Sequence, residues 1–458
     1  MESLSTQSAA WVAGLRYEDL PADVAEATKL RVLDSLGLML IAGTTKFGAA
    51  LRDGVGGMGQ GDACTLIGLG ARNSAMLAAL ANGALAEALQ FDDTHNETII
   101  HATSPTVAAA LAAAESGGAS GRDFLTAVAA GNELTCRIGV IAPGTFHPRG
   151  LHPTGIIGTF GATFAAARLL GLTEQQTVAA AGHAGSFASG ILACWEDGTD
   201  TQFIHPGWSA HGAIAAANFA RSGLTGPAAV LEGRFGLLPS HLHDLRGQLD
   251  FDRMVRDLGV EWESRNMSFK PYPTAHIIHP FLDALLYLYR EEGLRASDVE
   301  TLTVRIAEYM IPVVCEPVSE KIAPRTEAHG RVSLQYSLAE ALHCGRLGGD
   351  GYSAESIRDP AILELSGKIR YEIDAEAPGT ERYKGWVVAE TTDGRRLERI
   401  EDYNWGSREK PMTAQDIGAK FMANAENAVS RERAEAIMDA VDRLEDADSL
   451  DTLVAHCR

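Results

Sequence analysis

The chain has 458 residues, too many for one compact core at ~150 residues per domain, so two or three domains are expected. Its composition, 46% hydrophobic and 22% charged, is that of a globular protein and excludes a disordered or fibrous chain. With 39 basic and 60 acidic residues the net charge is −21, which argues against nucleic acid or an anionic membrane as the main partner.

Helix signals fill the first 268 residues, which are rich in alanine, glycine and leucine. Apolar residues recur at helical spacing over residues 24–40. Ser104 and Pro105 predict an N-cap followed by the first residue of a helix, and Thr173 with Gln176 predicts a capping box. Because small side chains let helix axes approach, we expect these helices to pack closely.

One glycine-rich segment, Gly54 to Gly59, matches the GxGxxG spacing of dinucleotide-binding turns. That mechanism needs a strand before the glycines and a long helix after them, and neither is evident in the sequence. We therefore predict a glycine-rich surface loop without a nucleotide site.

A change of pattern after Leu294 predicts half-buried strands, because apolar and polar residues begin to alternate. Asp393 and Gly394 separate two such runs and favour the positive φ of a tight hairpin turn. From Thr413 onward the pattern is helical again, with an apolar face that the tail alone cannot cover. The predicted strands are residues 301–306, 369–373, 386–391 and 395–400.

These patterns predict a mainly α protein with a large all-helical domain and a smaller α+β domain. The helical domain is expected over residues 1–268 and to be completed by the C-terminal helical segment, residues 404–458. The α+β domain is expected over residues 269–403.

The six cysteines form no CxxC pair and no zinc-type spacing with histidine, so neither a disulfide framework nor an iron–sulfur cluster is expected. The N-terminus lacks the basic and apolar regions of a signal peptide, and the apolar run at residues 38–42 is far shorter than the ~18–20 residues that span a bilayer. We expect a cytoplasmic protein without a membrane partner.

Lysine and histidine are distributed unevenly. Of eight lysines, only Lys270 lies between Lys46 and Lys321, whereas 11 of the 14 histidines fall between His95 and His279. This stretch therefore concentrates groups that titrate near neutral pH around a single lysine.

The first motif whose side chains could catalyse a reaction or bind a ligand is the segment from Phe91 to His101. It holds three carboxylates and two imidazoles between alanine-rich runs. Three interpretations stay open for it. Asp92, Asp93 and His95 could supply oxygen and nitrogen ligands to a metal, the acids could cap helix ends, or the segment could face a substrate.

Three further motifs follow along the chain. In His147 to Gly155, histidine and arginine precede a helix whose N-terminus favours an anion, although a solvated turn is the alternative. His205 lies before another alanine-rich helix, where a histidine commonly serves only as a satisfied hydrogen-bonding group. Lys270 lies between Phe269 and two prolines at the predicted domain boundary, where it could bind a carboxylate, act as a base or be an exposed linker lysine.

In combination these motifs resemble those of the MmgE/PrpD family, in order and over nearly the whole chain. The family includes 2-methylcitrate dehydratase, cis-aconitate decarboxylase and iminodisuccinate epimerase. The segments that carry the resemblance are Asp92-Asp93-Thr94-His95 with His101, Leu151-His152-Pro153-Thr154, His205-Pro206-Gly207-Trp208, Lys270-Pro271-Tyr272-Pro273, and Ser333-Leu334-Gln335-Tyr336 near Pro324-Arg325-Thr326.

The resemblance implies a helical domain, a smaller lid domain, a homodimer, and chemistry in the interdomain cleft without metal or other cofactor. The substrate would be a small polycarboxylate, from which a proton is moved at a carbon beside a carboxylate. The implied catalytic residues are His101, His152 and Lys270. The implied substrate-binding residues are Asp93, Thr94, Arg149, Gln202, His205, His276 and Tyr336.

Two positions depart from the family pattern. Gln90 stands where cis-aconitate decarboxylases have an acid, and Gln202 stands where many members have a lysine. A neutral amide thus replaces a cationic carboxylate anchor, which argues against cis-aconitate and favours a substrate with fewer charges or one anchored by Arg149.

The leading hypothesis is therefore a hydro-lyase acting on a hydroxy-polycarboxylate such as 2-methylcitrate, with His101 and His152 as acid and base in either order. Lys270 and Arg149 would bind carboxylates and stabilise the enolate-like transition state. The alternatives are an epimerase or isomerase of a dicarboxylate, a decarboxylase of a cis-aconitate-like acid, and a non-catalytic ligand-binding protein.

Overall fold

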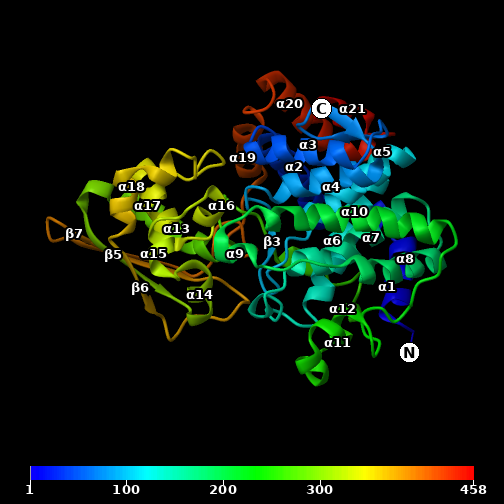
Figure 1. The fold of residues 1–458 in the computed structure, drawn as a ribbon, viewed down its shortest axis with the longest axis horizontal. Coiled ribbons are helices and arrows are strands. Elements are labelled where there is room, and N and C mark those ends of the chain that lie inside the picture. The colour runs from blue at the N-terminus through cyan, green and yellow to red at the C-terminus, as the bar shows by residue number, and fades with distance from the viewer. Residues whose placement is uncertain (1) are drawn as a thin grey trace.

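The computed structural model describes residues 2–458, which form two bodies lying side by side (Figure 1). The larger body contains the N-terminal helices together with the C-terminal ones, and the smaller contains a four-stranded sheet with its own helices. The predicted mainly α fold with a smaller α+β region is confirmed. No helix within residues 2–458 is long and apolar enough to cross a membrane.

The larger body is built around α7 (Pro153–Leu169), in which residues 153–167 are all buried. It packs against α5, α6, α8 and α10. The helices of this body before the tail are α1 (Leu4–Gly14), α2 (Ala22–Gly43), α3 (Lys46–Met58), α4 (Ala75–Glu87), α5 (Thr103–Gly117), α6 (Gly121–Gly139), α8 (Glu174–Phe187), α9 (Cys194–Asp197), α10 (Thr201–Arg221), α11 (Leu237–His241) and α12 (Asp252–Val255).

Glycines allow the closest helix contacts. A Cβ added to Gly83 of α4 would lie 2.7 Å from the Cα of Gly207 in α10, and one added to Gly131 of α6 would lie 2.8 Å from the carbonyl oxygen of Gly161 in α7. Larger residues would force these axes apart, so the expected close packing of helices is confirmed.

The C-terminal tail packs on the larger body through α19 (Ala414–Ala425), α20 (Arg431–Asp442) and α21 (Asp451–His456). Phe421 lies in the same hydrophobic core as the apolar side chains of α2. The Lys420 ammonium lies 2.8 Å from an Asp34 oxygen and donates to the Phe91 carbonyl oxygen at 2.8 Å. The tail thus contacts the start of the Phe91–His101 segment.

The smaller body has a mixed sheet of strand order β6-β5-β7-β8. The strands β5 (Val299–Ile306) and β6 (Ile369–Ile373) are parallel, whereas β7 (Gly385–Thr391) pairs antiparallel with β5 and with β8 (Arg396–Glu401). Gly394 has φ of 85° in the β7–β8 turn, as the hairpin prediction requires. The helices of this body are α13 (His279–Glu291), α14 (Ile311–Val314), α15 (Val318–Ile322), α16 (Glu327–Gly330), α17 (Leu334–Cys344) and α18 (Pro360–Ser366).

Local predictions have mixed outcomes. The capping box at Thr173 is confirmed, but the predicted cap at Ser104 is wrong, because α5 begins at Thr103 and the Ser104 hydroxyl donates to Asp92 instead. The predicted glycine-rich loop at residues 54–59 is wrong as well, since residues 46–58 form α3, which buries Leu51 and Val55.

Two short antiparallel ribbons add strands that the all-helical prediction for the larger body does not include. In the first, β1 (Cys64–Leu66) pairs with β2 (Ala71–Asn73). In the second, β3 (Thr94–His95) pairs with β4 (Met267–Ser268). The β3–β4 ribbon joins the Phe91–His101 segment to the chain just before Lys270.

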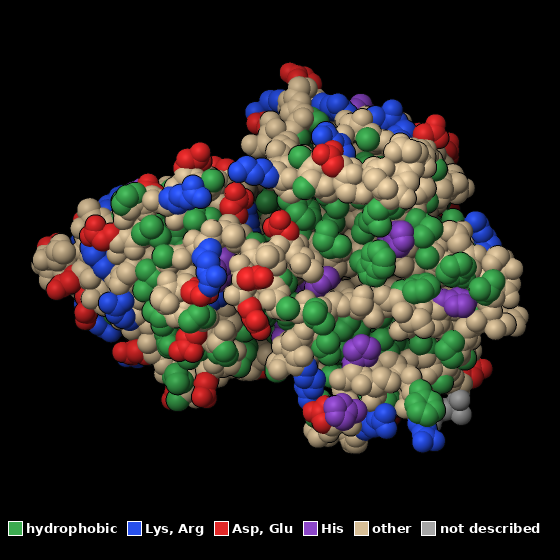
Figure 2. Space-filling model, viewed as in Figure 1, with side chains coloured by type: hydrophobic (Ala, Val, Ile, Leu, Met, Phe, Trp, Pro, Cys, Tyr) green, Lys and Arg blue, Asp and Glu red, His purple; other side chains and the backbone are tan. Residues whose placement is uncertain are grey.

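Hydrophobic side chains gather on the surface of the larger body around α10 (Figure 2). Trp208 and Phe219 of α10 are 42% and 44% exposed, and Leu224 just after the helix is 51% exposed. Apolar patches of this kind are common where another protein chain binds.

Candidate active site

The segment between α4 and α5 is held by backbone pairing. Thr94 pairs with Ser268 and His95 with Met267, which places Lys270 beside the same segment. The Lys270 ammonium is 1% exposed, donates to the Gln90 carbonyl oxygen at 3.0 Å and lies 3.8 Å from an Asp92 oxygen. Lys270 is therefore a buried group at the centre of the motifs, not an exposed linker lysine.

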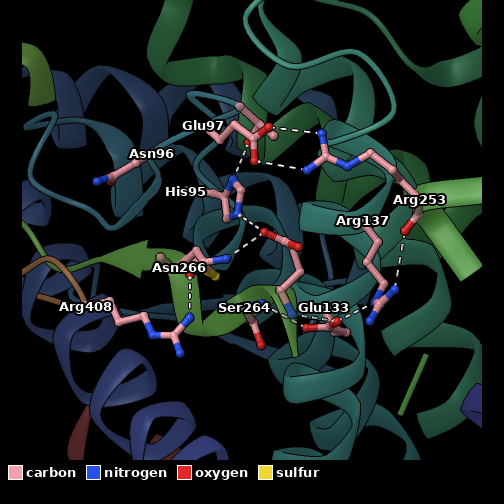
Figure 3. Close-up of polar contacts among 12 residues, drawn as sticks. His95, Asn96, Glu97, Glu133, Arg137, Arg253, Ser264, Asn266 and Arg408 are labelled. Carbon is pink, nitrogen blue, oxygen red and sulfur yellow. Dashed lines mark hydrogen bonds and ion pairs between the residues drawn. The ribbon is translucent and has the colours of Figure 1, made fainter. Parts of the chain in front are cut away.

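A polar network connects the Phe91–His101 segment to neighbouring elements (Figure 3). His95 Nε2–H donates a hydrogen bond to the Glu263 carboxylate at 3.1 Å, and Glu97 pairs with Arg253 at 3.0 Å. Glu133 of α6 accepts from the backbone N–H groups of Glu263 and Ser264, both at 2.9 Å. Both ring nitrogens of His95 thus have partners, Thr98 and Glu263, and His95 belongs to the support of the segment.

His101 forms an ion pair with Asp92, with 3.2 Å between His101 Nδ1 and the carboxylate. The Ser104 hydroxyl and the Lys270 ammonium lie on the same carboxylate, and the Thr94 hydroxyl lies 3.4 Å from His101 Nδ1. Burial alone would lower the pKa of His101, but the Asp92 carboxylate raises it above its ordinary value. The Asp92 carboxylate therefore favours the protonated form of His101.

His152 lies just before the first residue of α7 and has a different environment. Its Nδ1 lies 2.9 Å from Nδ1 of His205, and its Nε2 lies 3.8 Å from an oxygen of Glu87. Burial, and then the neighbouring His205, lower the pKa of His152 well below its ordinary value. His152 is therefore neutral at pH 7.

Glu87, at the C-terminal end of α4, is a site residue that the sequence analysis missed. Its carboxylate accepts a hydrogen bond from Gln202 at 3.0 Å, and the Trp195 indole donates to Gln202 at 2.6 Å. Burial raises the pKa of Glu87 to about 7, against a smaller opposing effect of His101. A carboxylate that ends an otherwise apolar helix, four residues before a motif, is the signal that could have indicated it.

Glu87, His101 and His152 converge on one point. Their ligand-type atoms lie within 4.8 Å of one another, and within residues 2–458 no other group of His, Cys, Asp and Glu side chains has this spacing. The three groups could hold a divalent cation, or a hydroxyl or water oxygen between them.

Burial lowers the pKa of Lys270, and the nearby Asp92 carboxylate opposes that shift. The ammonium lies within the same cluster as the imidazoles, where it can attract an anionic substrate group. His147 begins one of the predicted motifs but was not among the implied site residues, and its ring stacks on Trp195 at 5.7 Å between centroids. Burial and then His101 lower the pKa of His147 to about 3.

Six of the predicted residues are thus connected by contacts, and four have their nearest partners elsewhere. Asp93 pairs with Arg31 at 3.4 Å and accepts from Thr103. Arg149 turns outward to Asp244, which is 47% exposed. His276 lies 2.9 Å from the amide of Asn404, and Tyr336 is buried in the core of the smaller body, 5.9 Å from the ring of Tyr352. The six connected residues are Thr94, His101, His152, Gln202, His205 and Lys270.

Comparison with known proteins gives matches over both bodies. The MmgE/PrpD N-terminal domain matches residues 6–247, and the MmgE/PrpD C-terminal domain matches residues 272–446. A cis-aconitate decarboxylase-like protein, oryM, of Aspergillus oryzae is 26% identical over 97% of this chain and 95% of its own length. The cis-aconitate decarboxylases of Mus musculus and Homo sapiens are 25% and 26% identical over 99% of this chain and over 93% and 94% of their own lengths.

Proposed function

Because the chain belongs to the MmgE/PrpD family, we propose that it is a metal-independent hydro-lyase acting on a small hydroxy-polycarboxylate such as 2-methylcitrate. The resemblance seen in five sequence motifs is confirmed by both family domains, and the relatives' names support a lyase-type activity. The observation that carries the proposal is the convergence of Glu87, His101 and His152 beside Lys270.

Lys270 binds the substrate carboxylate next to the carbon that loses its proton. As the proton leaves, negative charge moves onto that carboxylate, and the buried ammonium stabilises it more strongly than water would. This preorganised cation raises the acidity of the carbon.

His152 is the base of the proposed reaction. When its Nδ1–H donates to His205, its Nε2 carries a lone pair that faces the space shared with Glu87 and His101. The C–H proton passes to this Nε2. Glu87, with a pKa of about 7, can receive the proton from His152 and release it between turnovers.

His101 is the acid. Held protonated by Asp92, it gives a proton to the hydroxyl that departs as water, while the electrons of the C–H bond form the new carbon–carbon double bond. Acid and base are thus assigned by opposite protonation of two neighbouring imidazoles. Each contributes typically ~10²–10⁴-fold to the rate.

The test is to add 2-methylcitrate to protein treated with a chelator and follow the absorbance of the conjugated alkene. His101→Ala is expected to abolish the signal without loss of folding. Absence of alkene with 2-methylcitrate, citrate and malate would rule out the hydro-lyase.

Decarboxylation of a cis-aconitate-like acid is the second candidate, since the relatives' names carry that activity. Gln202 weighs against it, because its amide is occupied by Glu87 and Trp195 and brings no charge to a third carboxylate. Release of carbon dioxide from cis-aconitate would favour this activity over dehydration.

An epimerase would use the same proton abstraction but return the proton to the opposite face of the carbon. Entry of solvent deuterium into recovered substrate without alkene formation would identify it. Calorimetric binding of a polycarboxylate without turnover would identify a non-catalytic protein.

We further propose that the protein is a homodimer. The exposed apolar side chains of Trp208, Phe219 and Leu224 support an interface on the α10 face. Light scattering is expected to give twice the chain mass, and Trp208→Asp is expected to shift the population toward monomer.

A further inference from the structure

The larger body contains a pocket whose lining residues do not include Glu87, His101, His152 or Lys270. It has a volume of about 450 Å³ and is lined by α2, α6 and the chain at residues 264–265 and 408–411. This volume falls within the range of small-molecule sites. None of its lining residues has a role in the reaction proposed above.

The rim and floor of this pocket carry three arginines, two of them already paired. Arg31, 5% exposed, pairs with Asp93, and Arg265 pairs with Asp23 at 2.7 Å. Arg408 donates to the amide oxygen of Asn266 at 3.2 Å (Figure 3), and no carboxylate of residues 2–458 lies within 4.0 Å of it. The pocket therefore retains positive charge that an anion would neutralise.

The pocket wall also contains a buried acceptor without a donor. Asn132, 2% exposed, donates from its amide nitrogen to the Thr103 hydroxyl at 3.0 Å, and Thr103 donates in turn to Asp93 at 2.6 Å. This chain of donors fixes the amide orientation and leaves Asn132 Oδ1 without a hydrogen-bond partner. An unpaired buried acceptor is costly, so a ligand hydroxyl that donates to it would be favoured.

We propose that this pocket binds a small hydroxycarboxylate, with its carboxylate on Arg31 and Arg408 and its hydroxyl donating to Asn132. The pocket is separate from the candidate active site, and the proposal does not rest on the reaction assigned there. Lined mainly by fixed helices and holding both a cationic and an accepting wall, it distinguishes hydroxylated from plain carboxylates.

The pocket is connected to the candidate active site through Asp93. Both Arg31 and the Asn132–Thr103 pair end on the Asp93 carboxylate, and the next residue along the chain toward the N-terminus is Asp92, which holds His101. A ligand that binds Arg31 competes with the Asp93 carboxylate for this guanidinium and so changes the support of the Phe91–His101 segment. By reciprocity, occupancy of one site changes affinity at the other.

The test uses calorimetry with malate on the full-length Lys270→Ala protein, in which the candidate active site is disabled. Malate is expected to bind with one site per chain, and Arg408→Gln in the same background is expected to weaken it about tenfold. Arg52→Gln on α3, an exposed arginine that does not line the pocket, is the control and should leave binding unchanged. His101→Asn replaces Lys270→Ala if that variant does not fold.

Succinate, which lacks the hydroxyl, is expected to bind the same protein at least tenfold more weakly than malate. Absence of malate binding in both backgrounds would overturn the proposal, as would equal binding by the Arg408→Gln protein. If the wild-type protein forms no alkene, this result would instead contradict only the hydro-lyase function proposed for the candidate active site.

Discussion

His101 and His152 are both buried in one cluster, with ring centroids 6.2 Å apart, but their surroundings shift their pKa values in opposite directions. The carboxylate of Asp92 raises the pKa of His101, whereas His152 has another imidazole as its nearest neighbour and its pKa falls. Burial is common to both, so the neighbour and not the burial decides the protonation state. We call the part of the site with Asp92, His101 and Lys270 its ionised half. The part with Glu87, His152 and Gln202 is its neutral half.

The largest effect is expected from removing the cation of the ionised half. Lys270→Ala should lower kcat/KM by about 10²–10³-fold, because the developing charge on the substrate loses its buried partner. Steady-state kinetics with a thermal-unfolding control measures it. Lys321→Met, which removes another buried lysine that donates to two backbone carbonyl oxygens, should lower stability with little change in kcat. Unchanged activity in Lys270→Ala would contradict this account of the site.

Asp92→Asn tests whether the carboxylate makes the two halves differ. Without it, burial and the Lys270 ammonium act on His101 against the smaller opposing effect of Glu87, so the pKa of His101 should fall below its ordinary value. Activity that depends on protonated His101 declines as pH rises through its pKa, so this decline should move to lower pH in the variant. Histidine NMR titration and the pH–rate profile check it, with Asp93→Asn as the adjacent control. A profile identical to that of the wild type would remove the acid role of His101.

Glu87→Gln tests the neutral half through the dependence of stability on pH. The pKa of Glu87 is about 7 in the folded protein against an ordinary value of 4.5, so its contribution to stability is complete below pH 4.5 and is lost as pH rises through 7. The variant should lack this loss and be more stable above pH 7, by on the order of 2–3 kcal/mol. Thermal unfolding between pH 4 and 8 measures it. Parallel curves for the two proteins would mean that Glu87 has the same pKa in the folded and the unfolded chain.

The smallest effect is expected for Gln202→Lys, which would place a cation in the neutral half. The new ammonium should pair with Glu87 and lower the pKa of that carboxyl, and it should improve KM for a tricarboxylate relative to a dicarboxylate by about tenfold. Gln175→Lys, on the exposed face of α8, is the matched control. If both variants keep the wild-type preference, Gln202 has no part in selecting substrate charge.

Sequence patterns predicted the secondary structure best where the signal comes from residues that are close together in the sequence. Helical periodicity indicated α2, and the Asp393-Gly394 turn indicated the β7–β8 hairpin, because each depends on residues close in sequence. The local pattern around Lys270 left an exposed linker lysine open, and its burial depends on contacts with residues 90 and 92, far away in sequence. What the patterns could not supply is which of two adjacent acids faces the site: Asp92 meets His101, while Asp93 meets Arg31.

Partners distant in sequence explain the remaining differences. Arg149 pairs with Asp244, which lies 95 residues later, and no local sequence pattern predicts such a pair. Glu87 was missed because its environment is made by Gln202 of α10 and by His152, just before α7. The strands β3 and β4 are two residues long, too short for any periodicity to show.

The contact between Lys420 and the Phe91 carbonyl oxygen has a consequence for how the protein is made. The two residues are 329 positions apart, so a ribosome that has synthesised the chain only up to residue 400 has not yet supplied this support for the segment before His101. A nascent chain can form α7 and the four-stranded sheet early, but its site is completed only after the last helices emerge. Chains that terminate early are therefore expected to fold in part and to remain inactive.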